Sequence, residues 1–218
     1  DPVTRNMSVD ALHEKLRKAQ ATGCLPKVVI PVDFSGLPAD LEDIRGLADR
    51  YGFAIVEDAS HAVGAEYREQ PVGSGLADIS AYSYQPVKIN TTGEGGLCAT
   101  NDDRLAARLR LLRSHGITRD EAQMGGQPDG PWYYEQIGLG FNYRMTDIQA
   151  ALGSSQLQRL DDLRERRDAL ARRYDTLLSR LPLKLPARLN DRQSSHHLYV
   201  VEIDEERTTV SRAELFAA

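Results

Sequence analysis

Apolar and polar residues follow two periods along the chain, and these periods predict its secondary structure. Apolar side chains recur three and four residues apart in four segments, which predicts amphipathic helices at residues 9–22, 41–51, 102–114 and 146–181. Short apolar runs predict strands at residues 28–32, 54–56, 77–84, 95–100 and 197–203. Strands and helices that alternate with short connections are typical of an α/β fold, in which helices cover a parallel sheet.

Single residues mark several boundaries of these predicted elements. Ser8 can cap the first helix, and Asp102 can cap the third. Pro31 has no amide hydrogen, so the first strand is expected to lie at a sheet edge or to end there. We expect the long helical stretch to bend near Gly153.

Two segments without either period predict loops. Residues 64–73 are expected to form a loop with a small hairpin. Residues 115–140 form a longer, glycine-rich loop that also contains Trp132, Tyr133 and Tyr134. A loop of this length is usually functional or disordered. The aromatic residues favour an ordered segment.

The two ends of the chain suggest a piece of a longer protein. The chain begins at Asp1 without an initiator methionine. Near the other end, Ser211 and Glu214 have the spacing of a helix-capping box, but only four residues follow Glu214. A helix of about one turn buries no apolar face. We therefore expect a fragment.

Composition narrows the classes of partner. The chain has 218 residues, of which 41% are hydrophobic and 27% charged, as in ordinary globular proteins. Its formal net charge is −5, and acidic and basic residues are interleaved, which argues against nucleic acid or an anionic membrane as a partner. Cys24 and Cys98 form no disulfide framework, and no apolar run reaches membrane-spanning length. A cytoplasmic protein is the simplest interpretation.

Polar residues follow the second and third predicted strands, where ligands bind in open α/β sheets. Asp58 and His61 follow the second strand, and Ser83 and Lys88 the end of the third. Taken singly, each has an ordinary explanation: a loop or helix-cap carboxylate, a surface histidine, a strand-end serine and an exposed lysine. Apolar neighbours can desolvate Lys88, and a neutral lysine attacks an aldehyde. Asp58 could then pair with a pyridinium nitrogen, His61 with the ring hydroxyl and Ser83 with a phosphate.

The glycine run at residues 93–96 has a different explanation. It matches neither the dinucleotide-binding fingerprint nor the P-loop pattern, so we do not expect a nucleoside triphosphate there. Its glycines permit a tight turn into the fourth predicted strand. A Rossmann-type nucleotide binder is disfavoured for the same reason.

At this point several blocks of the sequence resemble the DegT/StrS-type aminotransferases, which act on nucleotide-linked keto sugars. The blocks occur in the family's order and cover most of the chain: residues 57–65, 83–88, 92–96, 111–117 and 140–153. Residues 60–61 and 131–135 look closest to the members that aminate UDP-4-keto-6-deoxy-N-acetylhexosamines in pseudaminic acid synthesis. The resemblance implies pyridoxal phosphate as cofactor.

The resemblance also assigns roles to individual residues. Lys88 would be the Schiff-base lysine and the general acid and base, and Asp58 would pair with the pyridine nitrogen. His61 would lie near the ring hydroxyl, and Ser83 would bind the cofactor phosphate. Asn142 would reach the phosphate of the neighbouring subunit's cofactor, because the family's sites lie at a homodimer interface.

The implied fold is a partial large domain of a fold-type I pyridoxal-phosphate enzyme, with a mixed, mainly parallel sheet and flanking helices. We expect this large domain at residues 1–145, a connecting helical stretch at 146–181, and the start of a small α+β C-terminal domain at 182–218. A segment that contacts the phosphate and covers the ring in the family is absent, as is most of the small domain. The fragment by itself is therefore expected to bind cofactor poorly.

One position departs from the family pattern. Close members commonly have a histidine before the small-glycine turn after the first strand, and this chain has Asp33 there. The resemblance therefore assigns no role to Asp33.

The resulting functional prediction is a transaminase that passes an amino group from an amino acid, glutamate by resemblance, to a UDP-linked 4-keto-6-deoxy sugar. The product would serve cell-surface polysaccharide or secondary-metabolite synthesis. A dehydratase on the same scaffold is one alternative, although such enzymes have histidine where this chain has Lys88. A noncatalytic dimerisation or regulatory module of this fold is the other.

Overall fold

A four-stranded sheet lies at the centre of the protein, and the computed structural model describes residues 1–217. Its strands, in spatial order, are β1 (Val28–Val29), β2 (Ala54–Asp58), β5 (Ile79–Ser83) and β6 (Gly96–Ala99). The first three run parallel, whereas β6 runs antiparallel to β5. The expected α/β fold with a mixed, mainly parallel sheet is therefore confirmed.

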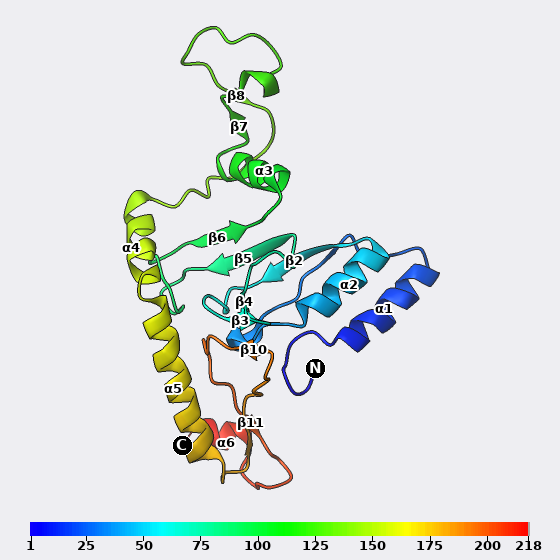
Figure 1. Ribbon diagram of the computed structural model, residues 1–218, viewed down its shortest axis with the longest axis vertical. Helices are drawn as coiled ribbons and strands as arrows, with labels where there is room; N and C mark the ends of the chain where they lie inside the picture. The colour runs from blue at the N-terminus through cyan, green and yellow to red at the C-terminus, as the bar shows by residue number, and fades with distance from the viewer. Residues whose placement is uncertain (218) are drawn as a thin grey trace.

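Helices α1 (Val9–Ala21) and α2 (Leu41–Tyr51) lie side by side, and α2 lies next to β2 (Figure 1). The Ser8 hydroxyl accepts a hydrogen bond from the Ala11 N–H over 3.2 Å, so Ser8 caps α1 as predicted. The helices and strands bury one apolar cluster between them. Its members are Leu16, Val29, Leu41, Ile44, Ala48, Tyr51, Phe53, Ile55, Tyr67 and Ala77.

The first two strands differ in length from their predictions. The first ends at Val29, and only an isolated bridge between Val32 and Asp58 extends its pairing. Pro31 lies between these points and cannot donate to a ladder, which explains the early end. The second strand instead runs two residues beyond residues 54–56, to Asp58. This extension places a carboxylate at the carboxyl end of β2.

The hairpin predicted within residues 64–73 is present. It consists of β3 (Glu66–Tyr67) and β4 (Gln70–Pro71), which pair antiparallel. A third strand, β10 (Arg192–Gln193), pairs with β3 from far along the chain. This small sheet joins the C-terminal part of the chain to the central part.

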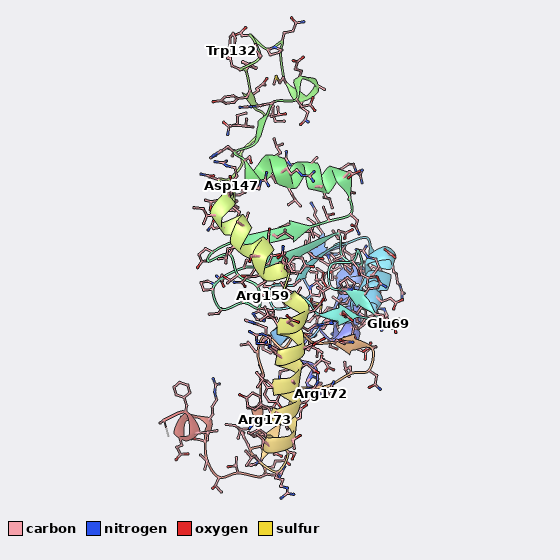
Figure 2. All side chains as sticks on the ribbon, turned by 60° about the vertical axis from the view of Figure 1, so that its left-hand side comes forward. Glu69, Trp132, Asp147, Arg159, Arg172 and Arg173 are labelled. Carbon is pink, nitrogen blue, oxygen red and sulfur yellow. The ribbon has the colours of Figure 1, made fainter. Side chains whose placement is uncertain are left out.

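Residues 115–140 form an ordered projection. They follow α3 (Asp103–Arg113), which Asp102 caps as predicted by accepting from two backbone amides. The projection contains an antiparallel pair, β7 (Ile117–Thr118) and β8 (Glu135–Gln136), and a short helix, η2 (Glu121–Gln123). It extends away from the central sheet, with Trp132 at its far end (Figures 1 and 2).

The long helical stretch consists of two helices, α4 (Asp147–Leu157) and α5 (Leu160–Leu178). The predicted bend near Gly153 is wrong, because the break lies at residues 158–159, where Figure 2 labels Arg159. Gly153 lies inside α4, where the absence of a side chain allows close packing. A Cβ atom at this position would lie 2.7 Å from Thr92 Cγ2, so the missing side chain lets α4 approach the loop that contains Thr92.

The prediction of a strand at residues 197–203 is largely wrong. Only β11 (Glu202–Ile203) is a strand, and it pairs with β9 (Leu183–Lys184). The Leu198 N–H donates to the Ser35 carbonyl over 3.3 Å, so a loop contact holds the start of this segment. The last helix, α6 (Arg212–Ala217), begins with the predicted capping box.

The proposed division at residues 1–145, 146–181 and 182–218 remains a prediction. Within the described residues, no helix combines the length and the apolar character needed to cross a bilayer.

Candidate functional site

The carboxyl ends of β2 and β5 lie next to each other and contain two predicted site residues. Asp58 ends β2 and is in register with Ala81 of β5, and Ser83 follows two residues later at the end of β5. Asp58 Oδ1 accepts a hydrogen bond from the Ser60 N–H over 3.1 Å. Both side chains are half-buried. The sheet therefore places a carboxylate and a hydroxyl along one edge.

Lys88 lies in a tight loop between β5 and β6. The Lys88 N–H donates to the Gln85 carbonyl over 3.0 Å, and the Thr92 N–H donates to the Tyr84 carbonyl over 3.0 Å. These bonds fold the loop back toward the end of β5. The Lys88 side chain is half-buried, and it forms no ion pair with an acidic side chain in residues 1–217.

Two imidazoles lie close to Lys88. The rings of His61 and His197 contact each other with centroids 4.5 Å apart and an angle of 38°. Burial, then the nearby Lys88 charge, lowers the pKa of His61, and Asp58 opposes this effect. Burial, His61 and then Lys88 lower the pKa of His197 to about 4. Both rings are therefore neutral near pH 7.

The nitrogens of the two imidazole rings differ in their hydrogen bonding. His61 Nδ1 accepts from the Ser35 N–H over 3.3 Å, so its proton is on Nε2. His197 Nδ1 is buried and has no hydrogen-bond partner among the described residues. A buried polar atom without a partner is costly unless a ligand or water completes it.

His197 was not predicted as a site residue, because its segment was expected to be a strand. Its position depends on contacts between distant segments. Ser195 Oγ donates to the His61 carbonyl over 2.8 Å, and the Ser195 N–H donates to the Gly36 carbonyl over 3.0 Å. The one sequence signal was the His196–His197 pair at the start of an apolar run.

Gly36 permits this close approach of the two segments. It has a φ of +97°, and a Cβ there would lie 2.9 Å from the His61 carbonyl oxygen. Any side chain would therefore collide with backbone while occupying an unfavourable conformation. From α5, the Arg167 guanidinium donates to the His196 carbonyl over 3.0 Å. The His197 segment is thus held from two sides.

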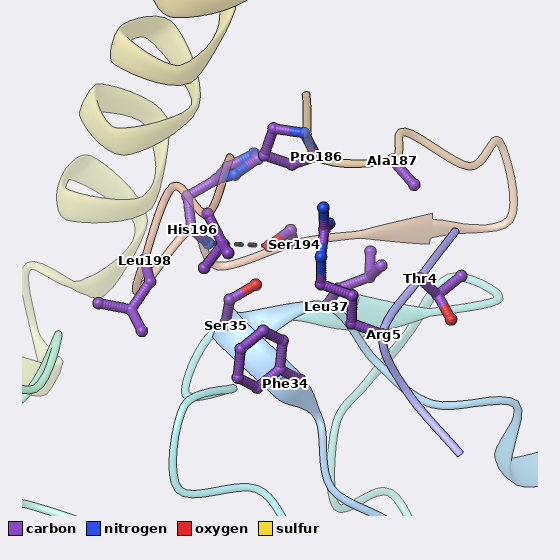
Figure 3. Close-up of a pocket in the computed structure, with 11 residues that line it drawn as sticks. Thr4, Arg5, Phe34, Ser35, Leu37, Pro186, Ala187, Ser194, His196 and Leu198 are labelled. Carbon is purple, nitrogen blue, oxygen red and sulfur yellow. Dashed lines mark hydrogen bonds between the residues drawn. The ribbon is translucent and has the colours of Figure 1, made fainter. Parts of the chain in front are cut away.

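A polar network fixes the same segment beside the site. The His196 ring lies 3.3 Å from Asp168, which also pairs with Arg172 and Arg188. Burial opposes ionisation of Asp168, but hydrogen bonds from both guanidinium groups lower its pKa overall. Figure 3 shows His196 with its N–H donating to the Ser194 hydroxyl over 3.0 Å, in a small pocket that Lys88 does not line.

Asn142 does not lie in this cluster. It forms an isolated bridge with Ser114 near the base of the projection, and its side chain is exposed. The neighbouring Phe141 and Tyr143 rings stack with centroids 4.7 Å apart and are also exposed. Asn142 therefore faces outward, where a second molecule could reach it, and its predicted role stays a prediction.

The side chains at this edge suit pyridoxal phosphate. The cluster provides a primary amine, a carboxylate and a hydroxyl on adjacent strand ends, and it includes the unpartnered nitrogen of His197. A carboxylate can pair with a ring nitrogen, and a lysine amine can bond to an aldehyde. In the part of the chain that the structure describes, no acidic side chain forms an ion pair with Lys88 that a cofactor would have to displace.

Comparison with known proteins supports the family resemblance. Residues 1–218 match the model of the "DegT/DnrJ/EryC1/StrS aminotransferase family". The chain is 39% identical over 193 residues to the spore coat polysaccharide biosynthesis protein SpsC of Bacillus subtilis, covering 88% of this chain and 49% of that protein.

Two solved structures share the fold. An aminotransferase of this family from Brucella abortus is 33% identical with a TM-score of 0.82, over 93% of this chain and 51% of that one. Helicobacter pylori PseC, an aminotransferase of pseudaminic acid biosynthesis, is 30% identical with a TM-score of 0.81, over 92% of this chain and 50% of that one. The chain spans about half the length of these relatives.

The family model matches the whole chain, and the relatives share both sequence identity and fold with it. The chain belongs to the DegT/DnrJ/EryC1/StrS aminotransferase family.

Proposed function

We propose that the protein containing this chain is a pyridoxal-phosphate-dependent aminotransferase of nucleotide-linked keto sugars. The observation that carries the proposal is the cluster of the Lys88 amine with two neutral imidazoles, next to the Asp58 carboxylate. A general acid and base must lie within reach of the proton it moves, and an amine in such a cluster can serve both roles.

Each residue then has a defined task. When bound, pyridoxal phosphate supplies an electron sink for the carbanion formed by removal of a proton from the substrate. Lys88 would bond to the cofactor and would hold and move the proton at the reacting carbon of the substrate. Asp58 holds a proton on the ring nitrogen, and His61 orients the ring hydroxyl. Ser83 binds the phosphate.

We further propose glutamate as the amino donor and a UDP-linked 4-keto-6-deoxy sugar as the acceptor. The similarity to SpsC and PseC supports a role in cell-surface sugar synthesis. A cytoplasmic homodimer with shared sites would bring Asn142 to the partner's cofactor phosphate. The exposed side chain of Asn142 is compatible with that role.

Reductive trapping tests the assignment of Lys88. The intact protein, mixed with pyridoxal phosphate, is expected to show a visible absorbance that borohydride bleaches. Mass spectrometry should then locate the cofactor on Lys88. A Lys88→Arg variant should lose the trapped mass and lower the amination rate by more than about 1000-fold, since both bonding and proton transfer depend on the amine.

Lys27→Arg is the matched control, because Lys27 is exposed and far from the site in the sequence. It should trap cofactor as the wild type does. Trapped cofactor without amination of any keto sugar would keep the assignment of Lys88 to the cofactor but contradict the proposed aminotransferase activity. A protein that traps no cofactor on Lys88 would favour the noncatalytic module and contradict the proposal.

A further inference from the structure

Two buried carboxyl groups lie behind the candidate site, and the proposed reaction does not use them. Asp33 follows β1 and begins the turn of η1 (Phe34–Gly36), and Glu57 directly precedes Asp58 in β2. Both residues are completely buried, with 0% relative exposure. The Asp33 N–H donates to the Asp58 carbonyl over 3.1 Å, so the backbone connects this pair to Asp58.

Each carboxyl group uses one oxygen to accept a hydrogen bond. Asp33 Oδ1 accepts from the Ala39 N–H over 2.8 Å, and Glu57 Oε2 accepts from the Ser80 hydroxyl. The other two oxygens, Asp33 Oδ2 and Glu57 Oε1, are buried without any other donor among residues 1–217. The two carboxyl groups lie close to each other, because each affects the ionisation of the other. Two ionised carboxylates have no hydrogen to share, so a hydrogen bond between their free oxygens requires one proton.

Among residues 1–217, acidic and hydroxyl groups surround the pair. Asp58 approaches from β2, and the Tyr82 hydroxyl and the Ser80 hydroxyl approach from β5. Within the described chain, no lysine, arginine or histidine donates a hydrogen bond to either carboxyl group. Burial and the charge of Glu57 raise the pKa of Asp33 well above its usual range, and burial raises that of Glu57.

We propose that Asp33 and Glu57 share one proton and act as positioning residues that hold Asp58 in place for the cofactor. Asp33 anchors the turn after β1 through Ala39, and Glu57 anchors β5 through Ser80. The shared proton joins these two anchors on either side of Asp58. The positioning of Asp58 for the cofactor rests on the proposed function, whereas the proton sharing does not.

The pair makes stability depend on pH in a defined direction. Its folded-state pKa is raised, so its contribution is fully present below the ordinary carboxyl range and is lost as pH rises through the raised pKa. Above that point a second buried negative charge repels the first and strains the turn after β1. An asparagine at position 33 keeps both hydrogen bonds, since its amide nitrogen donates to Glu57 and its oxygen accepts from Ala39.

Thermal unfolding of the intact protein without cofactor tests the proton sharing. As the pH rises above the ordinary carboxyl range the midpoint of the wild type should fall, and in Asp33→Asn this fall should be smaller by about 3–6 °C. Asp129→Asn removes an exposed carboxylate and should retain the wild-type slope. Glu57→Gln should flatten the slope as well, which keeps the test valid if one variant fails to fold.

Infrared spectra provide a second measurement on the same proteins. The wild type should show the carbonyl band of a buried protonated carboxylic acid near neutral pH, and Asp33→Asn should lack it. An unchanged pH slope in both variants, or no such band in the wild type, would overturn the proton sharing. These measurements need no cofactor. They can therefore contradict the proton sharing even if the proposed function is correct, and support it even if the proposed function is wrong.

Cofactor affinity tests the positioning of Asp58. In the wild type the dissociation constant of pyridoxal phosphate should rise more steeply with pH than in Asp33→Asn, by about tenfold near pH 9. Equal pH dependence in the two proteins would contradict the positioning role, even where the infrared band establishes the shared proton.

Discussion

Two regions of the molecule differ in how far their apolar side chains are buried. The packed region, residues 9–58, buries its apolar residues between α1, α2, β1 and β2. The projecting region consists of the projection at residues 115–140 and the segment that follows it through α4 to residue 157. In this region Leu139 is 90% exposed, Ile148 84% and Trp132 72%. Both regions are ordered, but only the first contains its own core.

This difference is the one expected if the proposed homodimer covers the second region. Exposed apolar patches beyond a few isolated residues mark interaction surfaces in folded proteins. The proposed homodimer would cover the projecting region, where Asn142 also lies. The packed region instead supplies the rigid sheet that positions Asp58. Three substitutions, ordered from the largest expected effect, test this comparison.

The largest loss of stability is expected in the packed region. Ile55 is completely buried in β2 within the main apolar cluster. Ile55→Ala removes buried methyl and methylene groups and leaves a cavity, which should cost about 2–5 kcal/mol of unfolding free energy. Chemical denaturation of the intact protein measures the loss. A cost below that of an exposed substitution such as Ile148→Ala would contradict the assignment of the core.

An intermediate effect is expected where the projecting region joins the central sheet. Gly153→Ala places a methyl group 2.7 Å from Thr92 Cγ2, and overpacking of this kind costs about 1–3 kcal/mol. Gly46→Ala is a matched control, because Gly46 also lies inside a helix and its added methyl group meets nothing within 4 Å. The control should stabilise the protein by about 0.5–1 kcal/mol, so thermal melts should shift in opposite directions.

The smallest change in the stability of a single chain is expected at the exposed surface. Ile148→Ser should alter the unfolding free energy of the monomer by less than about 0.5 kcal/mol. The same change should weaken self-association, because it removes apolar area from the proposed interface. Sedimentation velocity over a range of concentrations separates the two effects. Unchanged association in Ile148→Ser would place the interface elsewhere.

The helices were predicted closely because their signals are local. Ser8, Asp102 and the Ser211–Glu214 pair cap helices where their spacing indicated, since each cap involves residues within one turn. The prediction of the break in the long helical stretch failed at Gly153. Gly153 is instead needed for the close approach of α4 to Thr92, which is distant in the sequence.

The strands and the site were predicted less completely. A strand exists only where a partner strand continues, so β1 ends at Val29 and residues 197–201 form no ladder. Asp58, Ser83 and Lys88 could be singled out because each follows a recognisable strand or motif. His197 could not, because its role depends on the His61 ring, which contacts it from another part of the chain.

The sequence by itself determined the alternation of strands and helices, the caps, the order of the family motifs and the residue types at the strand ends. These properties depend on neighbours within a few residues. Only the tertiary structure placed His197 against His61 and brought the buried Asp33 and Glu57 carboxyl groups close together. Both contacts join segments that are distant in the chain, and burial in the folded protein gives them their chemistry.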